Sequence, residues 1–402
     1  MPQTEWENRN EDSQTIKILT KEIIEIKEKW GSRLCILGHY YQRPEILAVS
    51  DELGDSFKLS RDAATRDDCD VIVFCGVHFM AETADILANA PNRLALRYSP
   101  VQVLLPNPQA GCPMAEMATL REVESAWNEL EEQIDINEVV PVTYVNSSAA
   151  LKSFCGTRGG FACTSSNAEK VLKRAFSEKK RVFFLPDEHL GRNTSLAMGI
   201  PRDEIILWNN PNSTMLAETA TLESNGFLPA GTAERALELA RKPLGGNSPE
   251  TVKNAKVVLW RGFCPVHQRF RLTELTRFRD DHPKGKIVVH PECREEVVSA
   301  SDRAGSTKLI LDLVAQSKEG SEWAIGTERH MVDSLTNGFR DRTVLPLSEE
   351  KPICHSMDMI SLTTLHSTLT ALEEGKYQYP VQVSESIAAG ARLALNRMLE
   401  CQ

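Results

Sequence analysis

The chain alternates short, fully apolar runs with longer stretches in which apolar residues recur at helical spacing. In Lys286–Leu311, the apolar run Ile287–Val289 stops at His290-Pro291-Glu292. Further on, Gly305-Ser306-Thr307 leads into the helical pattern of Lys308–Val314. A short apolar run predicts a buried strand, whereas apolar spacings of three and four predict a helix. Because the two alternate, we expect right-handed βαβ crossovers and parallel sheets.

Looser copies of this unit occur twice before it. The expected strands are Leu34–Leu37, Val71–Cys75 and Leu94–Arg97 in the first third, Val139–Val145, Arg181–Leu185 and Lys256–Trp260 in the second, and Ile287–Val289, Glu322–Gly326 and Thr343–Leu345 in the third. The expected helices are Ile16–Trp30, Phe57–Thr65, Ala115–Glu122, Ala168–Phe176, Ala233–Ala240, Lys308–Val314, Ser361–Glu374 and Val383–Leu399. Each third also has one Cys at an equivalent point, which implies a pseudo-threefold arrangement around a shared centre.

We therefore predict an α/β protein of three related αβα domains with parallel sheets. The expected boundaries are 16–130, 131–275 and 276–402, the last with the C-terminal helices. Residues 1–15 are expected to be a disordered terminus. An insertion rich in Asn, Pro and Gly at about 201–249 is expected to contain one helix, near Ala233–Ala240.

Composition narrows the class of protein. With 402 residues, 41% hydrophobic and 25% charged, the chain has the make-up of a globular protein of two or three domains. A net charge of −10 argues against nucleic-acid binding. No apolar run approaches the roughly 20 residues of a membrane span. The polar, acidic N-terminus resembles neither a signal nor a transit peptide, so we expect a cytoplasmic location.

The ten Cys are not expected to form a disulfide framework in that compartment, and no C-x-x-C pair occurs. Cys112, Cys264 and Cys354 share one setting: a loop with a neighbouring Pro or Gly, before a helix. Thiolates at helix starts bind soft metals, so these three residues suit an iron–sulfur cluster with one iron open to substrate. They are equally compatible with three buried structural cysteines. The remaining seven are interpreted as core or incidental residues.

Small hydroxyl residues stand at the expected helix starts, and larger polar residues stand at the expected strand ends. Ser56, Ser165, Ser306 and Thr307 are either plain caps or parts of a phosphate or carboxylate site. The residues after strands are His39, Tyr41, Tyr144, Asn146, His290 and Glu292. Ligands of open α/β sheets bind beyond the carboxyl ends of the strands, which makes these residues candidates for binding or catalysis.

At these positions the sequence resembles the quinolinate synthase family. The resemblance covers about Gly38 to Glu374 and lies in ordered motifs: GHYYQ, GDSFKLSRDA, FCGVHFMAETADIL, GCPMAEM, TYVNSSAALK, CTSSNAEK, FLPDEHLGRN, GFCPVHQRF, VHPE, GSTKLI, GTERHMVDSL and CHSMDMISLTTL. Each motif alone is weak, but their order and spacing together are highly specific.

The resemblance implies an enzyme of NAD biosynthesis that condenses iminoaspartate with dihydroxyacetone phosphate to give quinolinate, phosphate and water. It implies a 4Fe–4S cluster held by Cys112, Cys264 and Cys354, whose fourth iron acts as a Lewis acid in dehydration. The substrate-contacting positions of the family fall on His39, Tyr41, Ser56, Tyr144, Asn146, Ser165, His267, His290, Glu292, Ser306 and Thr307. Of these, Glu292, His290, Tyr41, Tyr144 and His267 are the candidates for proton transfer. Functional coupling to an enzyme that supplies iminoaspartate is also implied.

One departure limits the resemblance, and alternatives remain open. The C-x-x-C-x-x-C that some members carry around the last cysteine is replaced by Lys351-Pro352-Ile353-Cys354, so redox control through a disulfide is not implied. The rival functions are another iron–sulfur hydro-lyase, a zinc-dependent aldolase and a non-catalytic phosphometabolite-binding protein. The aldolase would need a His-rich metal set that the spacing does not supply.

Overall fold

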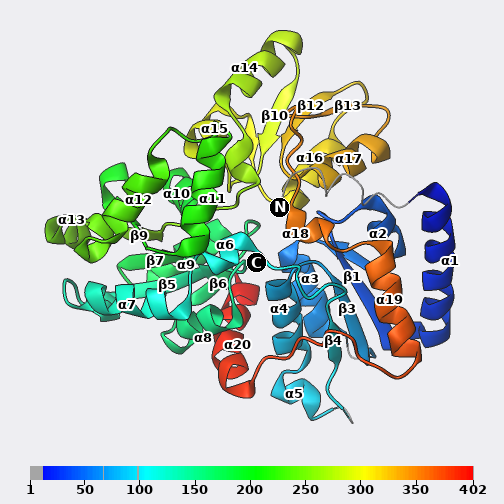
Figure 1. Ribbon diagram of the computed structural model, residues 1–402. Helices are drawn as coiled ribbons and strands as arrows, with labels where there is room; N and C mark the ends of the chain where they lie inside the picture. The colour runs from blue at the N-terminus through cyan, green and yellow to red at the C-terminus, as the bar shows by residue number, and fades with distance from the viewer. Residues whose placement is uncertain (1–11, 67, 97–98, 402) are drawn as a thin grey trace.

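A computed structural model describes residues 12–66, 68–96 and 99–401 (Figure 1). Residues 1–11 of the segment expected to be disordered lie outside these ranges. The helix α1 (Ser13–Trp30) begins before that segment ends, because Asp12 caps it: the carboxylate accepts the backbone N–H groups of Gln14 and Thr15. Asp at this position satisfies donors that the first turn of a helix leaves free.

The strands form three separate parallel sheets in the described part of the chain. The first sheet contains β1 (Leu34–His39), β2 (Glu52–Gly54), β3 (Val71–Cys75) and β4 (Gln102–Leu104). The second contains β5 (Val139–Tyr144), β6 (Phe161–Cys163), β7 (Arg181–Leu185), β8 (Ile205–Trp208) and β9 (Val257–Trp260). The third contains β10 (Lys286–Val289), β11 (Arg303–Ala304), β12 (Glu322–Gly326) and β13 (Thr343–Pro346).

The three sheets share one strand order, which confirms the internal repeat. The orders are β2-β1-β3-β4, β6-β5-β7-β9-β8 and β11-β10-β12-β13. In each sheet, the strand that comes first in the sequence lies between the strands that come second and third. A fourth strand then pairs with the outer side of the third. Only β8 has no counterpart, and it adds to the edge beside β9. Figure 1 shows the sheets as three lobes around a common centre.

Helices cover the sheets and connect their strands. Around the first sheet these are α1, α2 (Pro44–Val49), α3 (Ser56–Thr65), α4 (His78–Ala88) and α5 (Pro91–Leu94). The next two along the chain, α6 (Pro113–Glu116) and α7 (Leu120–Glu131), lie in the lobe of the second sheet (Figure 1). The second part of the chain adds α8 (Ala149–Thr157), α9 (Ala168–Glu178), α10 (Glu188–Ala197), α11 (Ser213–Ser224), α12 (Thr232–Ala240) and α13 (Pro249–Asn254). The third adds α14 (Leu272–Asp281), α15 (Glu295–Ala300), α16 (Thr307–Gln316), α17 (Arg329–Gly338), α18 (His355–Asp358), α19 (Leu362–Glu373) and α20 (Glu385–Glu400). Short 3-10 turns at 31–33, 136–138, 202–204, 243–246 and 267–269 complete the connections.

Three expected elements of secondary structure were wrong. The strand expected at Leu94–Arg97 is absent where it is described: Leu94 ends the short helix α5, which Pro91 starts with its fixed φ. Arg97 lies outside the described residues. The fourth strand of the first sheet is instead β4, further along the chain.

The helix expected at Ala115–Glu122 is two helices. Thr119 forms a capping box with Glu122 and starts α7 afresh after α6. The insertion also contains more than one helix. It supplies β8 and α11 as well as α12, because the apolar run Ile205–Trp208 pairs with β9 and Asn212 caps α11.

The third sheet shows how alternation along a strand builds a three-layer unit. Ile287 and Val289 of β10 belong to one buried cluster, with Leu275 and Phe278 of α14. Val288, between them, belongs to another cluster, on the opposite face, with Ile310 of α16. Successive side chains of a strand point to opposite faces, so helices bury both sides of this sheet. The first and second sheets share one larger buried cluster.

The last two helices leave the third sheet. By chain order they were expected with the third domain, but α19 packs against α1, and α20 packs against α8 and β6. The backbones of α8 and α20 approach closely at Gly156 and Gly390, where an added Cβ on Gly156 would lie 2.0 Å from the carbonyl oxygen of Gly390. Within the described ranges, none of the helices is both long and apolar enough to cross a membrane.

Candidate functional site

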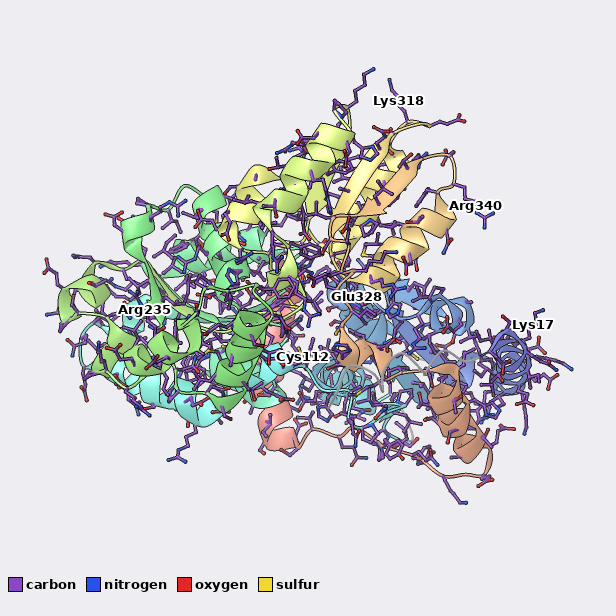
Figure 2. All side chains as sticks on the ribbon, turned by 45° about the horizontal axis from the view of Figure 1, so that its top comes forward. Lys17, Cys112, Arg235, Lys318, Glu328 and Arg340 are labelled. Atoms are coloured by element: carbon purple, nitrogen blue, oxygen red, sulfur yellow. The ribbon has the colours of Figure 1, made fainter. Side chains whose placement is uncertain are left out.

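The carboxyl ends of the three equivalent strands β1, β5 and β10 face one cavity. His39 is the last residue of β1, Tyr144 is the last residue of β5, and His290 directly follows β10. Twelve of the residues singled out in the sequence line this cavity: His39, Tyr41, Ser56, Cys112, Tyr144, Asn146, Ser165, Cys264, His290, Glu292, Thr307 and Cys354. Figure 2 shows Cys112 in the middle of the molecule, far from the peripheral Lys17, Arg235 and Lys318.

The structure places Cys112, Cys264 and Cys354 on the cavity, one from the loop after the last strand of each sheet. All three are half-buried, whereas six of the other seven cysteines are buried and Cys401 lies elsewhere. Burial raises the pKa of each of the three thiols, and that of Cys112 reaches about 12. The pKa of Cys264 is raised further by the nearby Cys354 and Cys112, so the three sulfur atoms lie close enough to repel one another as thiolates.

Backbone N–H groups near each of these sulfur atoms lower the pKa of the thiol and partly offset burial. They belong to Ala115 and Met114 beside Cys112, to His267 beside Cys264, and to Met357 and Ser356 beside Cys354. Such donors stabilise thiolates, which are the form that binds metal. Three convergent sulfur donors with this support fit a soft metal group such as an iron–sulfur cluster.

Glu292 is the centre of a buried polar group. Its Oε2 lies 2.8 Å from His267 Nδ1 and 3.8 Å from His290 Nδ1. The Tyr144 hydroxyl also donates to this carboxylate. His267 lies behind the cavity wall and stacks on His290 with ring centroids 4.5 Å apart. Because an ionised carboxylate only accepts, the ring proton of a neutral His267 lies on the Nδ1 beside it, and Nε2 can accept from the Thr327 hydroxyl at 3.2 Å.

The protonation states of Glu292, His290 and Tyr144 follow from this packing. Burial alone would raise the pKa of Glu292, but His290, His267 and the two hydrogen bonds outweigh it and hold the pKa at about 2. Burial lowers the pKa of His290 to about 3. Burial and the Glu292 charge raise the pKa of Tyr144 well above its usual range. Near neutral pH the group is therefore one carboxylate with a neutral His290 and a protonated Tyr144.

His39 and His290 are equivalent residues that are held in the same way. The backbone N–H of Tyr41 donates to His39 Nδ1 at 3.1 Å, and that of Glu292 donates to His290 Nδ1 at 3.4 Å. An accepting Nδ1 places the proton of a neutral imidazole on Nε2. In His290 this Nε2–H faces the Ser165 hydroxyl at 3.2 Å. The repeat thus presents two oriented N–H donors to one cavity.

The residues at the helix starts have different roles. Ser306 caps α16 by accepting the Leu309 N–H at 3.3 Å, and it does not line the cavity. Thr307 and Ser56 are the first residues of α16 and α3, and both line it. Ser165 lies in the turn before α9. The Thr307 hydroxyl and the Asn146 amide oxygen are buried, line the cavity and have no hydrogen-bond partner in the protein.

Sequence reasoning missed several residues of this site, among them the polar Asp55 and Thr327. Asp55 lines the cavity, caps α3 by accepting the Lys58 N–H at 2.9 Å, and accepts a hydrogen bond from Ser166. Thr327 follows β12, and its hydroxyl lies 2.6 Å from the Tyr41 hydroxyl. Both positions could have been found by the rules used elsewhere, since Asp is a preferred cap and Thr327 stands at a strand end.

Comparison with known proteins agrees with these motifs. Residues 21–400 match the family described as Quinolinate synthetase A protein. A quinolinate synthase of Rhodopirellula baltica is 44% identical over 95% of this chain and 91% of its own length. Those of Corynebacterium glutamicum and Bacillus cytotoxicus are 43% and 41% identical over 95% of this chain, and over 87% and 93% of their own lengths.

Proposed function

The chain belongs to the quinolinate synthetase A family of enzymes in NAD biosynthesis, and on this premise we propose that its central cavity condenses iminoaspartate with dihydroxyacetone phosphate to give quinolinate, phosphate and water. The observation that carries the proposal is the meeting of three thiols, one from each sheet, with the Glu292 group on one cavity. A protein that only bound a phosphometabolite would have no use for either feature.

Neutral donors bind the anionic substrates. Among the residues that line the cavity in the described chain there is no Lys or Arg. Negative charge is instead met by the free N–H groups at the starts of α3 and α16, where Ser56 and Thr307 stand. The Nε2–H groups of His39 and His290 add to these donors. Ser56, Ser165 and Thr307 hold the phosphate, and Asn146 binds the dicarboxylate.

Glu292 is the proton acceptor of the site. Its carboxylate is held in place by the Tyr144 hydroxyl and His267, and it opens onto the cavity. A carboxylate with a pKa of about 2 is a weak base, but anionic substrates bound beside it raise its proton affinity. Behind Glu292, His267 Nε2 faces the Thr327 hydroxyl, which faces the Tyr41 hydroxyl. Because the His267 Nδ1 proton points at the carboxylate, this chain can pass a proton toward Glu292.

Cys112, Cys264 and Cys354 would hold a 4Fe–4S cluster. When bound, the cluster supplies a Lewis acid, at the iron without a cysteine ligand, that helps a substrate hydroxyl to leave as water. We also infer that the enzyme works in the cytoplasm, where its ten free cysteines stay reduced, and that another enzyme supplies the unstable iminoaspartate.

The test is iron and sulfide analysis with the visible spectrum, on protein purified without oxygen. We expect about four irons and four sulfides in the wild type, and loss of both in Cys112→Ala, Cys264→Ala and Cys354→Ala. Cys401→Ala, which changes a half-buried cysteine away from the cavity, is the control and should keep the cluster. Quinolinate formation is then assayed with iminoaspartate and dihydroxyacetone phosphate. A colourless protein that the substitutions do not change would refute the proposal.

A further inference from the structure

A second set of metal donors lies at the cavity wall and shares only Cys264 with the three-cysteine set. One ligand atom each of Cys264, His267 and Glu292 lies within 4.8 Å of the other two. A tetrahedral zinc ion requires its ligand atoms somewhat closer than this, at bond lengths of about 2.0–2.3 Å. Small side-chain movements would therefore bring the three atoms onto one ion.

The three donors are held in place before any ion binds. The backbone N–H of His267 donates to the Cys264 carbonyl at 3.1 Å, so one turn of chain presents the thiol and the imidazole together. Gln268 Nε2 donates to the Glu292 carbonyl at 3.1 Å, which fixes the loop that carries the carboxylate. His267 and Glu292 are only 1% and 3% exposed, so little side-chain freedom remains to be lost when an ion binds.

The chemistry of the set suits a divalent cation of the zinc class. One thiolate, one imidazole and one carboxylate are all zinc ligands, and three protein ligands leave the fourth position open to the cavity. The tight contact of 2.8 Å between His267 Nδ1 and Glu292 Oε2 holds a proton that a cation can replace. A cation would also neutralise the buried charges of the carboxylate and the thiolate, which are costly when unpaired.

We propose that Cys264, His267 and Glu292 bind one zinc-class ion in the cluster-free enzyme, and that this ion blocks cluster assembly because Cys264 is needed for both. On binding, the Cys264 thiol releases its proton to solvent, and neutral His267 keeps its proton on the ring nitrogen that does not bind the ion. The ion site rests on geometry alone, whereas the competition also rests on the cluster of the proposed function.

The first experiment probes the site with Co²⁺, which occupies zinc sites and has a visible spectrum that zinc lacks. Full-length protein is freed of its cluster, checked for folding by circular dichroism, and titrated with Co²⁺. We expect one Co²⁺ per chain, with tetrahedral absorption and a charge-transfer band of one thiolate. The Cys112→Ala/Cys354→Ala double variant is the matched control, because it removes two thiols from the same cavity and should leave this spectrum unchanged.

Loss of a ligand should weaken the site. Replacing even an outer partner of a metal ligand costs about 10–100-fold in affinity, so Glu292→Gln and His267→Gln should each raise the Kd for Co²⁺ at least about tenfold. Cys264→Ala should abolish the charge-transfer band. Absence of Co²⁺ binding would overturn the proposal. The proposal would also be overturned by a charge-transfer band with the intensity of three thiolates that is lost in the double variant and unchanged in Glu292→Gln. That result would assign the ion to the three cysteines.

The second experiment tests the competition. Cluster-free protein is reconstituted with iron and sulfide, with and without one equivalent of Zn²⁺, and visible absorption is followed. Zinc should slow assembly in the wild type and have at least about tenfold less effect in Glu292→Gln. Equal slowing in both proteins, or none in the wild type, would overturn the competition and leave the Co²⁺ result to decide the site. Failure of both proteins to assemble a cluster without zinc would instead count against the proposed function and, with it, the competition.

Discussion

Arg43 Nη2 lies 2.8 Å from Asp358 Oδ1, and this contact joins the loop after β1 to α18, the short helix that begins directly after Cys354. The same Asp358 oxygen lies 3.5 Å from His330 Nε2, and His330 Nδ1 lies 3.1 Å from Glu328 Oε1. Glu328 in turn accepts the backbone N–H of Cys354 at 3.3 Å. Figure 2 shows Glu328 near the centre of the molecule. A chain of polar contacts therefore connects the first sheet to a cysteine contributed by the third part of the chain.

Arg43→Gln is expected to destabilise the protein by about 3 kcal/mol. The side chains of the pair are only 7% and 13% exposed, and removal of one partner leaves a poorly solvated charge. Chemical denaturation of the cluster-free protein measures this loss. Lys173→Gln is the control: it breaks the exposed pair with Glu169 and should change the free energy of unfolding by less than about 1 kcal/mol. Similar losses in both variants would mean that the Arg43 contact is no stronger than a surface pair.

Glu292→Gln is expected to lower turnover by about 10²–10⁴-fold while the visible spectrum of the cluster stays intact. Gln keeps the shape of the side chain and the contact with the Tyr144 hydroxyl, but it cannot accept a proton at working pH. Quinolinate formation and the absorption spectrum are measured on the same preparation. A Gln variant with nearly full turnover would remove Glu292 from proton transfer.

Lys152 is expected to make stability depend on alkaline pH. Burial lowers its pKa from 10.5 to about 8. Between these values the unfolded chain binds a proton that the folded chain does not, so folding gains stability as pH rises. Below about pH 8 Lys152 is charged in both the folded and the unfolded chain, so the full free-energy cost of burying its charge opposes folding.

The measurement is the difference in free energy of unfolding between the wild type and Lys152→Met. From pH 7.5 to 9.5 this difference should shift by about 2 kcal/mol in favour of the wild type. The subtraction removes the titration of all other groups, so a difference that is constant with pH would contradict the lowered pKa.

Gly156→Ala is expected to cost about 1–3 kcal/mol, because α8 and α20 cannot separate without disturbing the packing of their other side chains. Gly338→Ala is the matched control, since it changes an exposed helical Gly whose added Cβ meets nothing within 4 Å. That variant should be neutral or more stable by about 0.4–1 kcal/mol. Thermal denaturation compares the two, and equal effects would show that the close approach of the helices is not a constraint.

Much of the fold could be predicted because its signals are local. The runs Val71–Cys75, Arg181–Leu185 and Glu322–Gly326 are strands with the expected bounds, since each is a short apolar segment between polar turns. The insertion was only partly predicted. The pairing of β8 with β9 is decided by contacts across the sheet, and its neighbourhood of Asn, Pro and Gly resembles a loop.

The candidate site was predicted residue by residue, but its contacts were not. The strand-end rule and the family motifs singled out Glu292 and His267 separately, and no sequence signal brings Glu292 Oε2 to 2.8 Å from His267 Nδ1. Arg43 and Asp358 were not singled out, because an ion pair between segments far apart in the sequence leaves no periodic pattern. The positions of the C-terminal helices were missed for the same reason.

The sequence by itself determined the repeated strand–turn–helix unit, the residue types at each strand end and the family, since these depend on local periodicity and ordered motifs. Only the tertiary structure decided which residues meet. It brings Cys112, Cys264 and Cys354 to one cavity, stacks His267 on His290, and places α20 on α8. Parallel sheets put all their carboxyl ends on one edge, but the packing of three sheets around a centre decides that the edges face one another.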